Sequence, residues 1–282
     1  MSDFQQYLQQ KGYGKSSQRS LPRCVQEFLE FMHKNPTSTS QKDILDFYKH
    51  LQERPSKRST GGLSEVFIHH YLYSLRVFFN WLEQTGQMTE NPMSSLRFKQ
   101  PKYNRREPLS QSEIQALFAA CCSVKETAIL HLFYSCGLRR TEAERLNTED
   151  IHFAQNLLYV RKGKGAKRRA IPINKSVSEA FQRYLNIEKL FTAEKAFMLN
   201  NNQGRMSGSR YNIILKNIVK RSEIGKNISL HHLRHSIATH LLENGLHIEL
   251  VRDFLGHAHL ESTQIYTKVS TEQMKKVLHE HL

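Results

Sequence analysis

Apolar residues recur every three or four positions through the first third of the chain, a spacing that predicts amphipathic helices. One helix is expected over 16–34. A second begins at the capping residue Ser40 and carries an apolar stripe formed by Leu45, Tyr48 and Leu51.

A third, long apolar helix is expected over 64–86, ending at a glycine. Residues 90–98 are expected to form a turn and a short helical piece. Four or five such helices predict a small bundle that fills residues 1–97. The next segment, 98–108, carries two prolines among lysines and arginines and almost no apolar side chain, which is typical of a linker.

The pattern becomes mixed from Leu109 onward. Helical spacing returns, and the first helix there has Ser110 and Glu113 in capping-box register. Residues 156–173 alternate in two short runs around a glycine-containing turn, which predicts an antiparallel hairpin. The predicted fold is therefore mainly α with a small antiparallel β-sheet, arranged as a helical bundle at 1–97, a basic linker at 98–108 and an α+β domain at 109–282.

Composition adds a strong positive charge. The chain holds 41 Lys and Arg against 26 Asp and Glu, a formal charge of +15. Such a field attracts polyanions, and the clustering of the excess favours a nucleic-acid partner over a basic pI that only aids solubility. Six Lys and Arg lie within 161–169, and Arg105 and Arg106 lie in the linker. The linker either follows a phosphate backbone or is a solvated tether.

Targeting and metal signals are not found in the sequence. No stretch approaches the roughly 18 apolar residues that cross a bilayer, and the N-terminus has no apolar core of a signal peptide. The four cysteines show neither a disulfide rhythm nor paired metal spacing. A reduced, cytosolic protein is expected.

Two short stretches in the middle of the chain carry side chains suited to phosphate chemistry. Arg139 follows a Gly-Leu that ends one helix, where it could grip a phosphate or pair with Glu142 three residues on. Lys164 lies between glycines at the hairpin tip. Its side chain could project into a groove, or the segment could be an ordinary exposed Gly-Lys turn.

Two further stretches lie near the C-terminus. His231, Arg234 and His235 share one face of a predicted helix, where they could hold a phosphate and manage a proton. The alternative to phosphate binding is zinc binding, because His231 and His235 are four residues apart, although the glutamate of an HExxH motif is missing. His257 follows a glycine and Tyr266 lies nine residues later, where packing alone would explain a tyrosine.

Together these groups supply what covalent cleavage of a phosphodiester needs. A tyrosine nucleophile would keep the phosphate bond energy in an enzyme-linked intermediate. Arginines stabilise charge on the phosphoryl oxygens, and a lysine or histidine can protonate the departing oxygen.

The segments "GLRRTEAERL", "KGKGAKRRAIPI", "HHLRHSIATHLLENG" and "LGHAHLESTQIYTKV" occur in this order and resemble the tyrosine recombinase (integrase) family, especially its Xer type. The resemblance implies that Tyr266 is the nucleophile, which forms a 3′-phosphotyrosyl link, and that Arg139 and Arg234 clamp the phosphate. It implies that His231 manages a proton and that Lys164 protonates the 5′-hydroxyl leaving group. His257 would hydrogen-bond the scissile phosphate, and Glu142 would hold the site together. No metal or nucleotide cofactor is implied.

The resemblance also implies how the chain meets DNA. The first third is similar in layout to a core-binding domain, which with the catalytic domain would form a C-shaped clamp on duplex DNA. Four protomers would exchange strands between two sites through a Holliday junction, in chromosome dimer resolution or in integration and excision of a mobile element. A paired recombinase or an accessory protein is a further candidate partner, and the place of action would be the cytoplasm, on the nucleoid. The expected DNA contacts are Arg105, Arg106, Lys162, Lys167 and Arg168.

Some features depart from the family pattern or leave choices open. Ser135 and Cys136 precede the Gly-Leu-Arg, and Leu230 stands where a proline is common. The tail 270–282 is expected to form a short amphipathic helix that packs on its own domain or, as we hypothesise, on a neighbouring protomer. A non-catalytic DNA-binding protein on this fold and a type IB topoisomerase-like enzyme remain alternative functions.

Overall fold

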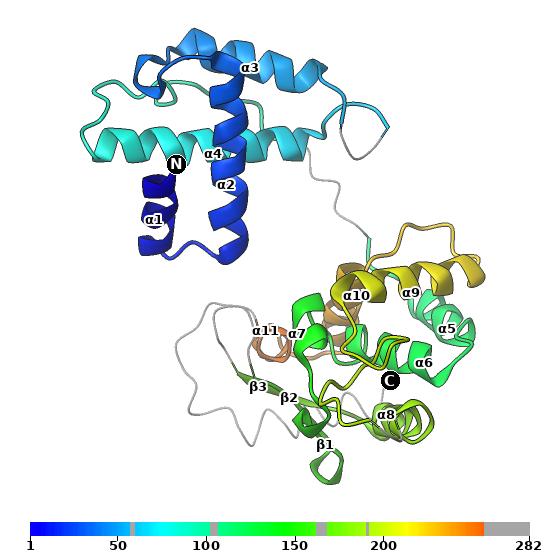
Figure 1. The fold of residues 1–282 in the computed structure, drawn as a ribbon. Coiled ribbons are helices and arrows are strands. Elements are labelled where there is room, and N and C mark those ends of the chain that lie inside the picture. Colours follow the sequence, from blue (N-terminus) through cyan, green and yellow to red (C-terminus); the bar gives the residue numbers. More distant parts are fainter. Residues whose placement is uncertain (57–59, 102–106, 162–167, 190–191, 257–282) are drawn as a thin grey trace. The chain divides into compact units, whose positions relative to one another are not determined.

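The chain divides into two compact units, Met1–Arg105 and Arg106–Leu282 (Figure 1). The computed structural model describes residues 1–56, 60–101, 107–161, 168–189 and 192–256. The limits expected for bundle, linker and second domain stay predictions.

The first unit is a bundle of α-helices. In Figure 1, α2 crosses α3 and α4, and α1 lies beside α2. The α-helices of this unit are α1 (Ser2–Gln10), α2 (Lys15–Met32), α3 (Gln41–Glu53) and α4 (Glu65–Gln84). Its core is rich in aromatic side chains, with Phe28 packed edge-on against both Phe47 and Phe79. The predicted helical bundle is thus present in this unit.

Three details of this unit differ from the sequence expectation. In α3, Leu51 of the predicted stripe is buried and Tyr48 packs against the core. Leu45, however, is 46% exposed, and Ile44 and Phe47 are buried, so the prediction was wrong at Leu45. Residues 90–98 form turns without a helix, because the Asn91 side chain accepts from the backbone of the turn and so replaces helical bonding. Helix α1 was not predicted.

In the second unit, α6 (Val124–Phe133) is packed among helices, and the same core cluster includes a small sheet. Every residue of 128–133 is buried, as expected for a helix that is apolar on all sides. Further helices of this unit are α5 (Gln111–Ala119), α7 (Arg140–Arg145), α8 (Lys175–Glu188), α9 (Gly208–Arg221), α10 (Leu230–Glu243) and α11 (Ile248–Leu255). The predicted capping box of Ser110 and Glu113 opens α5.

The sheet of this unit has the strand order β1-β2-β3 and is antiparallel throughout. Its strands are β1 (Ile151–His152), β2 (Leu157–Val160) and β3 (Arg169–Pro172). The predicted hairpin corresponds to β2 and β3, in which Val160 is paired with Arg169. Strand β1 was not predicted, but the fold class of a mainly helical protein with a small antiparallel sheet is confirmed.

One glycine shapes the connection that leads to the candidate site. After α6 the chain turns at Gly137, which has φ +56°, a conformation that L side chains rarely adopt. A Cβ atom there would lie 2.9 Å from Leu255 Cδ2. The glycine therefore allows the turn before α7 to approach the end of α11, and Figure 1 shows these two helices side by side.

Candidate active site

Arg139 is the residue that opens α7, as its sequence position after Gly-Leu suggested. Its backbone N–H donates to Glu142 Oε2 at 2.9 Å, and its Nη1 donates to Glu142 Oε1 at 2.8 Å. The pairing that the sequence left open is therefore present. The guanidinium also donates through Nη2 to the carbonyl oxygen of Gly256 at 2.8 Å.

Arg169, at the start of β3, holds the same carboxylate from the other side. Its Nη1 donates to Glu142 Oε1 at 3.0 Å and its Nη2 to Oε2 at 2.8 Å, a two-pronged ion pair. The side chain of Glu142 is 1% exposed and that of Arg169 is 9% exposed. In the sequence, Arg169 is one member of a basic run, and this role was not predicted.

These contacts fix the charge of Glu142. Burial by itself would raise the pKa of this carboxyl, but the hydrogen bonds and charge of Arg169, with those of Arg139, lower it to about 2. Glu142 is therefore ionised throughout the physiological range.

Arg234 approaches the same corner from α10. Its guanidinium donates to the carbonyl oxygens of Gly137 and, at 2.6 Å, of Leu255. Burial, followed by the like charges of Arg139 and Arg169, lowers the pKa of Arg234. An anion in this corner would offset both effects.

The remaining residues of the predicted helix face lie differently from Arg234. His231, in the first turn of α10, and His235, one turn on, are both exposed. Arg234 is 3% exposed, because it turns towards α11 and the turn at Gly137.

The C-terminal end of α11 completes the described part of the cluster. Gly256 has φ +66°, and a Cβ atom there would lie 2.8 Å from Arg169 Nη1. A glycine at this position lets Arg169 reach Glu142 while the Gly256 carbonyl receives Arg139. The sequence places His257 immediately after this corner.

Together, Arg139, Arg169, Arg234 and Glu142 carry a formal charge of +2. An arginine has five N–H donors, and the described contacts of Arg139 and Arg234 each use two nitrogen atoms of the side chain. Donors and positive charge therefore remain available for an anion with several oxygen atoms, such as a phosphate.

The opposite side of α10 holds the segment that enters this unit. His232 Nε2 contacts the carbonyl oxygen of Glu107 at 2.5 Å, and the Leu109 backbone N–H donates to Ser236 Oγ at 2.9 Å. His240 Nε2 donates to the Leu109 carbonyl oxygen at 2.7 Å. The start of the second unit is thus fixed to the helix that carries Arg234.

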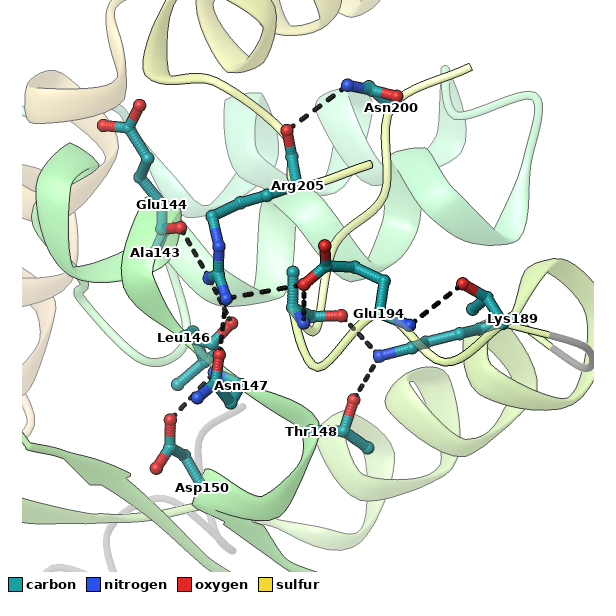
Figure 2. A network of polar contacts seen from close by, with 12 residues as sticks. Ala143, Glu144, Leu146, Asn147, Thr148, Asp150, Lys189, Glu194, Asn200 and Arg205 are labelled. Carbon is teal, nitrogen blue, oxygen red and sulfur yellow. Dashed lines mark hydrogen bonds and ion pairs between the residues drawn. The ribbon is translucent and has the colours of Figure 1, made fainter. Parts of the chain in front are cut away.

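A separate polar network holds the C-terminal end of α7 (Figure 2). Arg205 donates to the carbonyl oxygens of Glu144 and Leu146 at 3.0 and 3.3 Å and to Asn147 Oδ1 at 2.7 Å. It also lies 3.7 Å from a carboxylate oxygen of Glu194. A cation at this end of a helix is favourable, so the network stabilises α7 without contacting Glu142.

Several predicted site residues lie outside the described residues, namely Lys164, His257, Tyr266, Arg105, Arg106, Lys162 and Lys167. Arg168 is described and exposed. Within the described ranges, no cluster of three or more His, Cys, Asp or Glu is placed to hold a metal ion. In the same part of the chain no helix is long and apolar enough to cross a membrane.

Comparison with known families identifies both parts of the chain. Residues 107–273 match the phage integrase family, and residues 1–90 match the N-terminal SAM-like domain of phage integrases. A tyrosine recombinase of Thermosipho africanus is 35% identical over 279 residues, which cover 96% of this chain and 95% of that protein. Tyrosine recombinase XerA of Pyrococcus horikoshii is 30% identical over 285 residues, covering 99% and 92%.

The fold also matches solved structures. The Tn1549 transposon integrase in complex with circular intermediate DNA has a TM-score of 0.71 at 19% identity, with 97% of each chain covered. A XerA recombinase crystal structure has a TM-score of 0.53 at 24% identity, covering 98% of this chain and 96% of that one.

Proposed function

The chain belongs to the phage integrase family as a tyrosine recombinase of the Xer type, and on this premise we propose that it cleaves duplex DNA at specific sites and rejoins the strands in new pairs. As a tyrosine recombinase it is an enzyme, a DNA strand transferase. The observation that carries the proposed chemistry is the convergence of Arg139 and Arg234 beside the buried pair of Glu142 and Arg169.

In the proposed reaction, this cluster binds the scissile phosphate. The oxygen of Tyr266 attacks phosphorus, the bond to the 5′-oxygen breaks, and a 3′-phosphotyrosyl link forms. Arg139 and Arg234 donate to the phosphoryl oxygens and stabilise their charge in the transition state. A free phenol has a pKa near 10, so positive charge beside Tyr266 would make it a better nucleophile.

Proton transfer completes the cycle. His231 accepts the phenol proton, Lys164 donates a proton to the 5′-oxygen, and His257 hydrogen-bonds the phosphate. The reverse attack, by the 5′-hydroxyl of a second strand, releases Tyr266. Two such exchanges would pass through a Holliday junction.

The proposed assembly has four protomers on two DNA sites, and a paired recombinase or accessory protein is a candidate partner. It would act in the cytoplasm, on the nucleoid, to resolve chromosome dimers or to move a mobile element. Glu142 holds Arg139 in place. The residues proposed to contact DNA phosphates are Arg105, Arg106, Lys162, Lys167 and Arg168.

We further propose that the tail 270–282 docks on a neighbouring protomer. Deletion of the tail should leave single-site binding nearly intact but reduce cooperative binding to paired sites.

Covalent trapping tests the proposal. Protein is captured from cells under denaturing conditions, and the DNA linked to it is sequenced to identify the site. A duplex of that sequence, nicked beside the scissile phosphate, should form a covalent complex with wild type, whereas the Tyr266→Phe protein should bind it without a covalent link.

The alternatives give different results. Specific binding by wild type without any covalent complex would indicate a non-catalytic DNA-binding protein. Covalent linkage at no defined site, together with relaxation of supercoils, would indicate a type IB topoisomerase-like enzyme.

A further inference from the structure

We propose that Arg169 is a positioning residue for strand transfer, acting through Glu142 and the end of α11 to hold Arg139 in place for the phosphate. The inference rests on the proposed function. Arg169 itself is not required to touch DNA in this role.

Both oxygen atoms of the Glu142 carboxylate are fully engaged. Each carboxylate oxygen accepts two donors, one from Arg139 and one from Arg169. Without Arg169, a buried carboxylate would lose half of these donors, which is costly for a charged group. Glu142 would then take up a proton or turn towards water, and Arg139 would lose its fixed partner.

Arg169 also makes a separate contact with α11. Arg169 Nε donates to the carbonyl oxygen of Phe254 at 2.9 Å, in the last turn of that helix. Two residues later the carbonyl oxygen of Gly256 accepts from Arg139. One guanidinium therefore ties both partners of Arg139, the carboxylate and the helix end, to strand β3.

Arg169 also has a particular position in the hairpin. It pairs with Val160 where β2 ends and β3 begins, beside the segment 161–168 that joins the two strands. In the sequence, Lys164 lies five residues before it. Arg169, which holds Arg139, is thus also adjacent to the segment that carries Lys164, the proposed acid.

The experiment uses full-length protein and a nicked duplex of the sequence recovered by trapping on Tyr266. Single-turnover cleavage and DNA affinity are measured for wild type, Arg169→Lys and Arg169→Gln. Both substitutions should slow covalent complex formation by about 10- to 100-fold, as for other partners that orient a reacting group. DNA affinity should change by less than about threefold, because the misplaced Arg139 affects mainly the transition state.

A pH profile separates positioning from general loss of structure. In wild type, Glu142 keeps its charge at all pH values at which cleavage is measured, because its pKa is about 2. In Arg169→Gln, burial opposes the charge with less compensation and raises the pKa of Glu142, so cleavage should gain an acid limb as the pH falls. The double variant Glu142→Gln/Arg169→Gln should lack that limb and be no slower than Glu142→Gln alone.

Arg205→Lys is the matched control. Arg205 is another arginine that ties α7 to its surroundings, but it contacts the carbonyl oxygens of Glu144 and Leu146 and not Glu142. This variant should lose stability without gaining an acid limb. If Arg169→Gln unfolds, the charge-preserving Arg169→Lys is measured in its place, well below its melting temperature.

Two outcomes would overturn the inference while leaving the proposed function intact. One is a covalent complex formed by Arg169→Lys and Arg169→Gln at the wild-type rate. The other is a loss of cleavage that matches the unfolded fraction, with an unchanged pH profile. Failure of wild type to form any covalent complex would instead overturn the proposed function.

Discussion

At the scale of single residues, Glu142 determines how three arginines can lie together. Arg139 and Arg169 both bind its carboxylate, and its charge opposes the fall in the pKa of Arg234. A neutral residue at this position would leave three cations close together with none of their charge offset inside the cluster. Glu142 should therefore stabilise the fold as well as the geometry of Arg139.

This role predicts a pH-dependent effect of Glu142→Gln on the free energy of unfolding. The folded state lowers the pKa of Glu142 from the usual 4.5 to about 2, which corresponds to about 3 kcal/mol of stability. Because the folded pKa is lowered, this contribution is present above about pH 5 and is lost as the pH falls towards 2. Urea unfolding of wild type and variant should therefore show a difference that is constant near neutrality and shrinks below pH 4.5.

Glu179→Gln on α8 is the control for this measurement. The Glu179 side chain is 46% exposed, and its carboxylate oxygens lie 3.9 Å from Lys175 Nζ and 3.8 Å from Arg183 Nη2. Surface pairs of this kind contribute little, so the variant should differ from wild type by well under 1 kcal/mol at each pH. An equal effect of the two substitutions would contradict the role given to Glu142.

At the scale of elements, the end of α11 depends on a glycine for two reasons. Gly256 combines φ +66° with a close approach to Arg169, whereas Gly245, after α10, has φ +81° and open space around the position of a Cβ atom. A comparison of alanine substitutions at the two glycines therefore distinguishes the cost of backbone strain from the cost of a steric clash.

Gly256→Ala should destabilise the protein more than Gly245→Ala. A left-handed alanine costs about 1 kcal/mol or somewhat more, and both variants share that cost. Gly256→Ala adds a collision with Arg169, for which crowding in a packed region suggests a further 1–3 kcal/mol, roughly. Urea unfolding measures both, and only Gly256→Ala should also slow covalent complex formation. Equal losses of stability would mean that Arg169 yields without cost.

The individual helices and strands show how much of the fold could be predicted from the sequence. Helix starts at Ser40 and Ser110 depend on bonds within four residues, so local pattern was sufficient. The stripe of α3 was wrong at Leu45 because Ile44 and Leu45 are adjacent apolar residues, and only packing on α2 and α4 decides between them. Strand β1 has two residues, which is too short for an alternating pattern.

The candidate site was predictable only in part, for the same physical reason. Arg139 and Glu142 are three residues apart on one helix, so their pairing follows from helix geometry. Arg169 is 27 residues from Glu142 in the sequence, and their contact depends on how β3 packs beside α7. A usable signal existed, because Arg169 lies two positions before the buried Ile171 and therefore on the inward side of the strand.

At the scale of the whole molecule, the formal charge of +15 is far larger than the +2 of the arginine cluster. Most of the positive charge therefore lies outside the groups proposed to bind the scissile phosphate. We expect these outer cations to provide affinity for DNA along its backbone, and the inner cluster to provide catalysis. The two contributions should respond differently to salt.

Salt dependence of binding tests this division. Replacing Lys167 and Arg168 by Gln should weaken binding of the full chain to its duplex and should reduce the magnitude of the slope of log K against log salt by about 2, since each phosphate contact contributes about 0.9. Cleavage of the DNA that remains bound should change little, because the described contacts of Glu142 come from Arg139 and Arg169. The control Lys175→Gln/Arg183→Gln removes the same charge from α8, where both residues are exposed beside Glu179. If the control alters the slope as much as the hairpin variant does, net charge governs affinity; if the hairpin variant alone alters it, Lys167 and Arg168 are phosphate contacts.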